Sequence, residues 1–361
     1  MNFKLYHMDV KSGFSNRLLH KEVFVEQPKG FQDPKFLDHV LRLKIAIYGL
    51  KQAPRAWYYR LMSYLLDHGF NRGQADRKLF VKCDDKSLFV AQVYVDDIVF
   101  ESTIDNLAQE FSEEMKKEFE MSMVGERNYF FGLQVKQRKD GIFISREKCA
   151  KNLVKSFSLD SKKHASIPMS SSVKVSSNPA GVEIDPTLYR SMISSLLYLT
   201  TSRLDIAFSV EACACFQAAP KESHMTAVKR IIRYVNGTSD YGIWYSTGLN
   251  DYLARYSDAN WVGCVDDRKN TSGGCFYLRN NLVSWMSKKQ NLVSLATVEV
   301  EYIATGGCCA QLLWMKKLLP NYGISQDTMC IFYDNTSAIN LSKNPVQHSK
   351  SKYVKIRYHF I

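Results

Sequence analysis

The sequence lacks any apolar run long enough to cross a membrane, and its first residues do not form a signal peptide. It contains no internal repeat and no zinc-knuckle or CxxC cysteine spacing among its 9 cysteines. An odd number of scattered cysteines is typical of reduced, mostly buried thiols. We therefore expect a soluble intracellular protein, cytoplasmic or nuclear, that makes no membrane contact.

The chain does have the size and apolar content of a folded protein. Its 361 residues are enough for two or three compact domains, and 45% of them are hydrophobic. The formal net charge is +12, which suits a polyanionic partner, because Lys and Arg release counterions from phosphates. Basic proteins without such a partner are also common, so charge alone does not identify one.

The first part of the chain reads as alternating strands and helices. Strands are predicted at 5–10 and 21–26, and a helix is predicted from Pro54 to Gly69. The segment SLFVAQVYVDDIVFES predicts two apolar strands in a tight hairpin, separated by Asp96 and Asp97. Apolar residues that recur every four positions then predict an amphipathic helix at 107–119.

A change of composition follows. The segment SIPMSSSVKVSSNPAGVEIDP is rich in Ser and Pro and has no periodicity, which predicts a linker or long loop. A helix with a buried stripe is expected at 221–237, ending at Asn236-Gly237. The last third predicts three strands, a long helix at about 297–319, a fourth strand at 329–333 and a short helix at 337–341.

Three carboxylates in the first part suggest chemistry. Asp9 follows a short strand, and Asp96 and Asp97 lie at the tip of the predicted hairpin. If the fold brings them together, they form an all-oxygen site suited to magnesium. An Asp pair in a hairpin is more often ordinary turn chemistry. On the Asp pair alone, an ordinary hairpin turn without a metal is therefore the better interpretation.

The motifs around these residues change that balance. YHMDVKSGF, YGLKQAPRAWY, GFNRGQADRKLF, YVDD and YFFGLQV resemble, in the same order, motifs of copia-type retrotransposon reverse transcriptases. The resemblance implies that Asp9, Asp96 and Asp97 hold two Mg²⁺ ions for phosphoryl transfer. It also implies contacts to substrate or primer by residues of these motifs, namely Phe14, Gln52, Tyr94, Phe131, Gly132 and Leu133. Phe14 and Phe131 could equally be ordinary core residues.

A second set of carboxylates comprises Asp258, Glu301 and Asp334. Two lie at predicted strand ends and one on the long helix. YSDANWVG, DDRKNTSGG, TVEVEYIA, YDNTSAI and NPVQHSKSKY resemble copia-type ribonuclease H. The resemblance implies that these three side chains share two Mg²⁺ ions and cleave the RNA strand of a DNA/RNA hybrid.

The resemblance implies an α+β palm, a helical or mixed connection region and a C-terminal α/β ribonuclease-H-like domain. We expect the palm at 1–165, the linker and connection at 166–250, and the last domain at 251–361. The family has a fingers segment before the first aspartate and continues beyond the last residue of this chain. The resemblance therefore predicts a chain without fingers and truncated at its C-terminus.

Two substitutions also depart from the family pattern. Arg17 stands where the family has Gly, a change that would strain a left-handed backbone. SKYVKIRYHFI resembles a family pattern TKHIDIRYHFI, so Lys355 replaces an acidic residue and Tyr353 replaces His. A lysine there would bring a positive charge beside the ribonuclease metals.

The expected function is an RNA-directed DNA polymerase with ribonuclease H, acting on RNA template, primer, dNTPs and DNA/RNA hybrid. A catalytically inactive nucleic-acid-binding remnant of a decaying element is the alternative. Intact Asp9, Asp96 and Asp97 favour the first, and the missing fingers favour the second. A host protein that reuses the fold for interactions is a third possibility, but no added domain supports it.

Overall fold

The computed structural model describes a mixed α/β chain in two compact units. The described residues are 4–11, 13, 22–84, 87–126, 129–170, 175–247, 253–260, 266–294, 296–325 and 329–343. Unit 1 comprises Met1–Arg127 and Lys317–Gly323, and unit 2 comprises Asn128–Lys316 and Ile324–Ile361.

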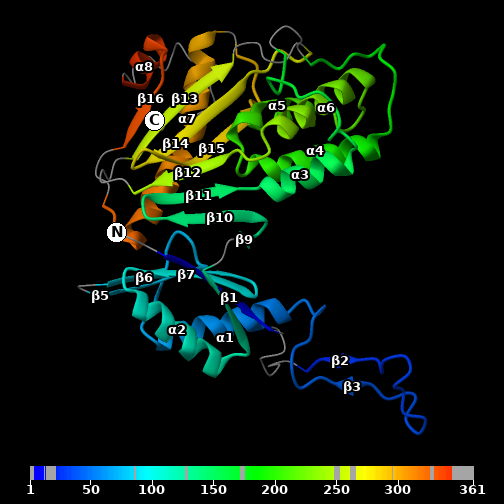
Figure 1. Ribbon diagram of the computed structural model, residues 1–361, viewed down its shortest axis with the longest axis vertical. Helices are drawn as coiled ribbons and strands as arrows, with labels where there is room; N and C mark the ends of the chain where they lie inside the picture. Colours follow the sequence, from blue (N-terminus) through cyan, green and yellow to red (C-terminus); the bar gives the residue numbers. More distant parts are fainter. Residues whose placement is uncertain are drawn as a thin grey trace. The chain divides into compact units, whose positions relative to one another are not determined.

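Unit 1 is built on a six-stranded sheet in the order β4-β5-β6-β7-β1-β8. Its strands are β1 (Lys4–Val10), β4 (Asn71–Arg72), β5 (Leu79–Asp84), β6 (Ser87–Tyr94), β7 (Asp97–Ser102) and β8 (Met121–Glu126). Two helices, α1 (Ala53–Asp67) and α2 (Asp105–Glu118), cover one face of this sheet (Figure 1). Two short strands, β2 (Phe24–Val25) and β3 (Leu41–Arg42), pair apart from it.

The helices of unit 1 form where the apolar spacing predicts them. Pro54 lies in the first turn of α1, and Trp57, Leu61 and Leu65 are buried against the sheet. On α2, Phe111 of the predicted apolar stripe is buried, and the later members of the stripe are buried as well. Rings from both helices and the strands contact one another, so the core of this unit is largely aromatic.

The opposite face of β5 and β6 is also covered in part. Leu79, Val81, Leu88 and Val90 form a small buried cluster. Two partly buried residues of unit 1, Leu318 and Tyr322, pack against it. Tyr322 ends the 3₁₀ turn η2 (Leu319–Tyr322), which therefore docks on the sheet.

Unit 2 contains two four-stranded sheets and most of the helices. One sheet has the order β12-β11-β10-β9 and the other β15-β14-β13-β16. The strands are β9 (Tyr129–Phe130), β10 (Leu133–Arg138), β11 (Gly141–Ser145), β12 (Gly242–Ser246), β13 (Leu253–Asn260), β14 (Thr271–Leu278), β15 (Asn281–Lys289) and β16 (Cys330–Phe332). The helices are α3 (Glu147–Ser156), α4 (Pro186–Thr200), α5 (Leu204–Ala214), α6 (Glu222–Gly237), α7 (Thr297–Leu318) and α8 (Thr336–Lys343). The last two residues of α7 belong to unit 1. Helices α3 to α6 share one hydrophobic core.

The predicted order of the last third, three strands, a helix, a strand and a helix, is confirmed. One detail of the prediction is wrong: β13 continues to Asn260, so Asp258 lies within the strand and not after its end. The pairing with β14 extends across this residue and holds the strand straight through it. In the Ser/Pro-rich segment, the described residues 166–170 and 175–185 form neither a helix nor a named strand.

Within the described part of the chain, no helix combines the length and the apolarity that membrane crossing requires. The eight described cysteines are free thiols, and three of them, Cys213, Cys308 and Cys309, are buried. Cys83 and Cys215 are exposed, so the prediction of mostly buried thiols holds only in part.

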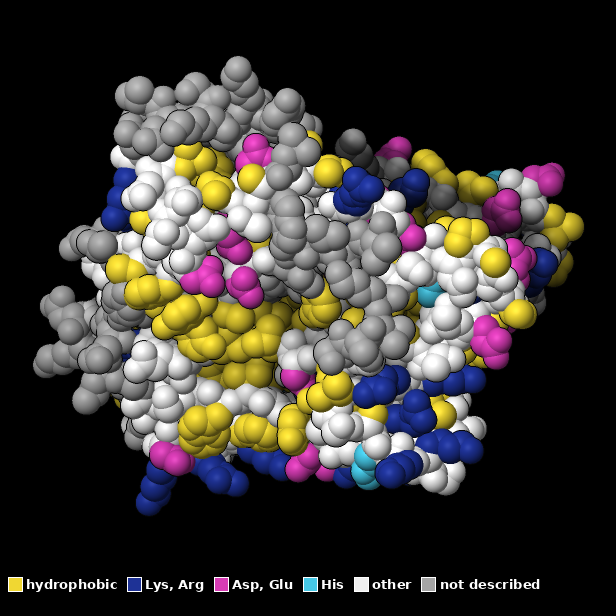
Figure 2. Space-filling view, turned by 90° about the horizontal axis from the view of Figure 1, so that it is seen from above, with side chains coloured by type: hydrophobic (Ala, Val, Ile, Leu, Met, Phe, Trp, Pro, Cys, Tyr) yellow, Lys and Arg dark blue, Asp and Glu magenta, His cyan; other side chains and the backbone are white. Residues whose placement is uncertain are grey.

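One face of the molecule shows how charge is distributed (Figure 2). Hydrophobic side chains form a broad exposed band there, with several Asp and Glu side chains beside it. Lys and Arg side chains gather mainly away from that band. On this face, the Lys and Arg side chains are therefore unevenly distributed.

Candidate active sites

Asp9 and Asp97 lie directly opposite one another on paired strands. β1 and β7 run antiparallel, and the register places Asp9 across from Asp97 at the end of the ladder. Two like charges at directly opposed positions destabilise a sheet unless a cation or solvent screens them. The strand register thus places two carboxylates side by side, and we call Asp9, Asp96 and Asp97 the first carboxylate group.

Asp96 lies in the turn between β6 and β7. The turn residues are Val95 and Asp96, because Tyr94 pairs with Asp97. The predicted separator, Asp96-Asp97, is therefore wrong by one residue. Val95 has φ +54°, a left-handed conformation that a β-branched residue rarely adopts and that marks local backbone strain.

Two hydrogen bonds hold this strained turn. The indole N–H of buried Trp57 donates to the Val95 carbonyl oxygen at 2.8 Å. The backbone N–H of Val10 donates to the Asp96 carbonyl oxygen at 3.0 Å. The turn is thereby fixed to α1 on one side and to the strand that carries Asp9 on the other.

The Asp96 side chain is only partly satisfied within the described structure. The Tyr48 hydroxyl donates to Oδ2 at 3.1 Å, and buried Oδ1 has no hydrogen-bond partner there. Burial raises the pKa of Asp96, and the neighbouring charges of Asp9 and Asp97 add to that rise, while the Tyr48 hydrogen bond opposes it. A Cβ at Gly13 would lie 2.7 Å from Oδ1, so glycine there leaves room for this oxygen.

His7, which the sequence motifs did not single out, contacts the same group. Its ring is buried, and Nε2 lies 2.5 Å from Oδ1 of Asp97. His7 is two residues before Asp9 on one strand and therefore points to the same face. That spacing is the signal that could have identified it, and Tyr48 could have been found from its place in the YGLKQAP motif.

The predicted substrate contacts of unit 1 lie at the surface. Gln52 is the exposed residue that precedes α1, and its side chain makes no capping hydrogen bond. Tyr94 is 48% exposed, and the Lys78 ammonium lies 5.1 Å from its ring centroid. Phe14 and Arg17 lie outside the described residues.

The remaining predicted contacts form a hairpin turn in unit 2. Phe131 and Gly132 connect β9 to β10 with φ +46° and +73°, the two positive values of a type I′ turn. The Tyr198 hydroxyl donates to the Phe131 carbonyl oxygen at 2.8 Å, and a Cβ at Gly132 would lie 2.5 Å from that hydroxyl. Only glycine fits this position, and Leu133 begins the next strand. Arg146 stacks on the Tyr198 ring at 3.7 Å and fixes it.

Asp258, Glu301 and Asp334, the second carboxylate group, converge in unit 2. β13 and β16 are parallel, with Tyr256 opposite Phe332, so Asp258 and Asp334 each follow two residues later at the same end of the sheet. Glu301 comes from α7, and its Oε1 accepts the backbone N–H of Ala259 at 3.2 Å.

The charges of Asp258 and Asp334 act on the Glu301 carboxyl. Burial raises the pKa of Glu301 to about 7, and the charges of Asp258 and Asp334 contribute to the rise. Oε2 of Glu301 is buried and has no hydrogen-bond partner in the described structure. Buried Arg255 donates to the carbonyl oxygens of Ala304 and Thr305, which ties β13 to α7 beside Glu301. Lys355 and Tyr353 lie outside the described residues.

Neither carboxylate group has the side-chain arrangement of a complete metal site among the described residues. Across the described residues, no set of three or more His, Cys, Asp or Glu side chains is arranged to hold a metal ion. The donor chemistry nevertheless fits Mg²⁺, because every carboxylate offers oxygen. The unpartnered Asp96 Oδ1 and Glu301 Oε2 are the atoms that a cation would satisfy.

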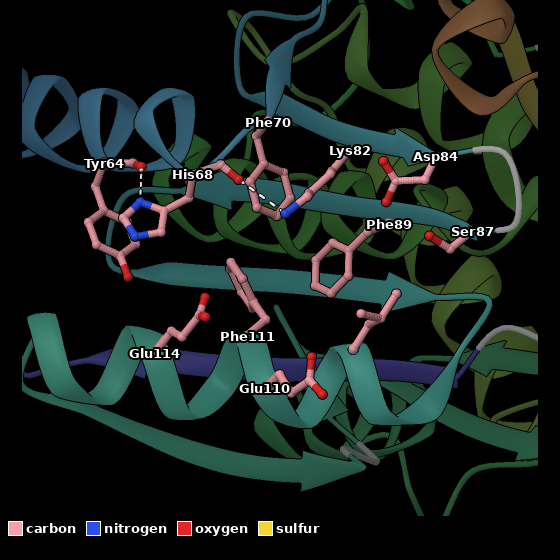
Figure 3. Close-up of a pocket in the computed structure, with 11 residues that line it drawn as sticks. Tyr64, His68, Phe70, Lys82, Asp84, Ser87, Phe89, Glu110, Phe111 and Glu114 are labelled. Atoms are coloured by element: carbon pink, nitrogen blue, oxygen red, sulfur yellow. Dashed lines mark hydrogen bonds between the residues drawn. The ribbon is translucent and has the colours of Figure 1, made fainter.

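A separate cavity of about 180 Å³ lies between α1, α2 and the strands of unit 1 (Figure 3). The rings of Phe70, Phe89 and Phe111 line it, and the Lys82 ammonium reaches across to the carbonyl oxygen of His68 at 3.2 Å. None of the predicted site residues lines this cavity. It belongs to the packing of the helices against the sheet and not to the first carboxylate group.

Comparisons with known proteins agree with the motifs. The family described as "Reverse transcriptase (RNA-dependent DNA polymerase)" matches residues 1–171. The chain is 37% identical, over its whole length, to the retrovirus-related Pol polyprotein from transposon RE2 of Arabidopsis thaliana, of which it covers 25%. It is 30% identical, over its whole length, to that from transposon TNT 1-94 of Nicotiana tabacum, of which it covers 28%.

A shorter relative is an uncharacterized mitochondrial protein of Arabidopsis thaliana. It is 31% identical over 62% of this chain and 92% of its own length. The protein therefore contains a reverse transcriptase domain. It belongs to the copia-type retrotransposon Pol polyproteins and spans about a quarter of the length of the curated Pol relatives that it matches.

Proposed function

We propose that the first carboxylate group is the polymerase site of an RNA-directed DNA polymerase. The observation that carries this proposal is the register of β1 against β7, which opposes Asp9 to Asp97 beside the Asp96 turn. The substrates would be an RNA template, a primer and dNTPs. The group would hold two Mg²⁺ ions, which activate the primer 3′-hydroxyl and neutralise the leaving pyrophosphate.

The chain's own residues have defined parts in this proposal. Trp57 and Val10 hold the turn, so that Asp96 keeps its place when a charged substrate enters. Phe14, Gln52 and Tyr94 would contact the incoming nucleotide or template. The Phe131–Gly132 turn would contact the primer, with its strained backbone fixed by the hydroxyl of Tyr198.

Magnesium-dependent primer extension on an RNA template tests the polymerase proposal. Asp96→Asn keeps the shape of the turn and removes one carboxylate, so extension should fall by at least about a hundredfold. Asp76→Asn, an acidic residue of the same unit outside the group, is the matched control. A folded wild-type chain that extends no primer would contradict the proposal.

We also propose that the second carboxylate group cleaves the RNA strand of a DNA/RNA hybrid. The convergence of Asp258, Glu301 and Asp334 supports a ribonuclease-H-like domain at 251–361, after a palm at 1–165 and a linker and connection region at 166–250. Hybrid cleavage should disappear in Glu301→Gln. Glu299→Gln, also buried on α7, is the control and should retain cleavage.

A catalytically inactive nucleic-acid-binding remnant is the second candidate, and one observation favours it. The imidazole of His7 contacts Oδ1 of Asp97, so it competes with a cation for that oxygen. His7→Gln separates the candidates: if the imidazole blocks the site, extension should rise in this variant. If the wild type already extends a primer, the remnant candidate is excluded.

A further inference from the structure

Three aromatic side chains share one face of the sheet β12-β11-β10-β9. The register places Lys136, Phe143 and Trp244 in one row across three strands, and Tyr129 opposite Gln134 in the next row. Because directly paired residues point to the same side, the rings of Tyr129, Phe143 and Trp244 lie on a common face. We call these three rings, with Lys136 and Arg138, the aromatic face.

Two glycines let the rings of this face lie flat on the backbone. A Cβ at Gly141 would be 2.7 Å from the Trp244 indole, and a Cβ at Gly242 would be 2.7 Å from the Phe143 ring. Each ring therefore covers the backbone of a neighbouring strand where a side chain is missing. Trp244 and Phe143 are therefore covered in part by the sheet and keep part of their surface exposed.

The exposure of the face agrees with that geometry. Trp244 is 37% exposed and Tyr129 is 45% exposed, and Phe143 is partly buried. The reverse side of the same sheet carries aliphatic residues such as Val135, which is 7% exposed. On the reverse side Val135 is buried and its neighbours Ile144 and Ile243 are partly buried, whereas Tyr129 and Trp244 on the aromatic side are exposed.

Positive charge is interleaved with the rings. The Lys136 ammonium lies 6.0 Å from the Phe143 centroid, and the Lys148 ammonium lies 6.0 Å from the Tyr129 centroid. Arg138 is exposed on the same face. The nearest acidic residue of α3, Glu147, already pairs with Lys151 at 2.5 Å. Rings that stack with bases and cations that follow phosphates are the two components of a single-strand binding surface.

We propose that the aromatic face binds unpaired bases of single-stranded nucleic acid. Paired bases hide their faces within the duplex, so exposed rings have stacking partners only in a single strand. The inference rests on the proposed function, because the RNA template of a polymerase is single-stranded ahead of the primer. The aromatic face adds a base-stacking surface outside both carboxylate groups.

The test compares a labelled oligothymidylate with an abasic strand of equal length by fluorescence anisotropy in EDTA. The wild-type chain should bind the thymidylate at least about fivefold more tightly, the lower end of the effect of one stacked base. Trp244→Ala should lower binding of the thymidylate toward that of the abasic strand, and Trp244→Phe should retain most of the difference. Trp314→Ala, at a residue 44% exposed on α7, is the matched control and should change neither.

Lys136→Ala provides an independent arm. It removes a phosphate contact, so both strands should weaken equally, and the slope of log affinity against log salt should fall by about 0.7. Tyr129→Ala replaces Trp244→Ala as the decisive variant if melting curves show that the latter is unfolded. Equal binding of both strands by the wild type would overturn the inference, as would a decisive variant that binds thymidylate like the wild type.

Because binding is measured in EDTA and primer extension is measured separately in magnesium, the two proposals can fail independently. A preference for thymidylate over the abasic strand without any primer extension would contradict the polymerase proposal alone. Extension without that preference would contradict the aromatic face alone.

Discussion

Asp96 in the first carboxylate group and Glu301 in the second each have one oxygen without a hydrogen-bond partner in the described structure. The two residues differ in the donor that binds their other oxygen. In unit 1 the donor to Asp96 is the hydroxyl of Tyr48, a side chain that is 54% exposed. In unit 2 the donor to Glu301 is the backbone N–H of Ala259, which no substitution removes except proline. The hydrogen bond to Asp96 can therefore be removed by a substitution of a neighbouring side chain, whereas the hydrogen bond to Glu301 comes from the main chain.

The causes of the raised pKa values differ as well. Burial and nearby like charges together raise the pKa values of Asp96 and Glu301. Glu101, on the same strand as Asp97, reaches a pKa of about 7 through burial alone. Burial without any carboxylate neighbour thus produces a shift as large as that within the second group, so a raised pKa does not by itself mark a catalytic residue.

The largest expected effect is a reciprocal loss of activities. Asp96→Asn should abolish primer extension and leave hybrid cleavage within about twofold, and Glu301→Gln should do the reverse. The reason is that the two groups belong to separate compact units. Both activities are measured on the same preparations. Loss of both in either single variant would show that the groups are not independent.

The second prediction compares two tryptophans. Trp57 and Trp285 each donate an indole N–H to a backbone carbonyl oxygen, of Val95 and Thr200 respectively. Trp57→Phe should cost about 2–3 kcal/mol of unfolding free energy, because it leaves a cavity and an unpaired carbonyl at the strained turn. Urea denaturation measures this cost.

Primer extension distinguishes the two tryptophans further. Trp57→Phe should also reduce primer extension, because the turn that carries Asp96 loses its anchor. Trp285→Phe should leave extension unchanged. Equal effects of both variants on extension would remove the special role given to the Val95 turn.

The smallest effect concerns Glu101. Its folded-state pKa, about 7, lies above its unfolded value of 4.5, so the folded state binds more protons between these values. Stability therefore falls as pH rises through this window. Glu101→Gln should be more stable than the wild type at pH 8.5, by on the order of 2 kcal/mol, and nearly equal to it at pH 4.5. Denaturation curves of both proteins at the two pH values check the sign.

Much of the fold follows from local patterns in the sequence. The stripe from Trp57 to Leu65, the hairpin around Asp96 and the strand and helix order of the last third are all present. The convergence of Asp258 and Asp334 also follows, because parallel strands end at one edge. These features depend on periodicity and topology, which the sequence carries directly.

Other features could not be read from local patterns. The turn is displaced by one residue because the tertiary anchor of Trp57 holds Val95 in a conformation that its own propensity opposes. The contacts of His7 and Tyr48 depend on long-range pairing.

The place of β1 in the sheet has a consequence for biosynthesis. This strand leaves the ribosome before the other strands of its sheet, yet it lies between β7 and β8 in the interior of the sheet. Both of its hydrogen-bonding edges must wait for partners that are translated much later. During that interval Lys4–Val10 is an unpaired strand with apolar side chains, a segment that chaperones recognise and that can pair wrongly. Asp9 therefore cannot take its place opposite Asp97 until β7 has been translated.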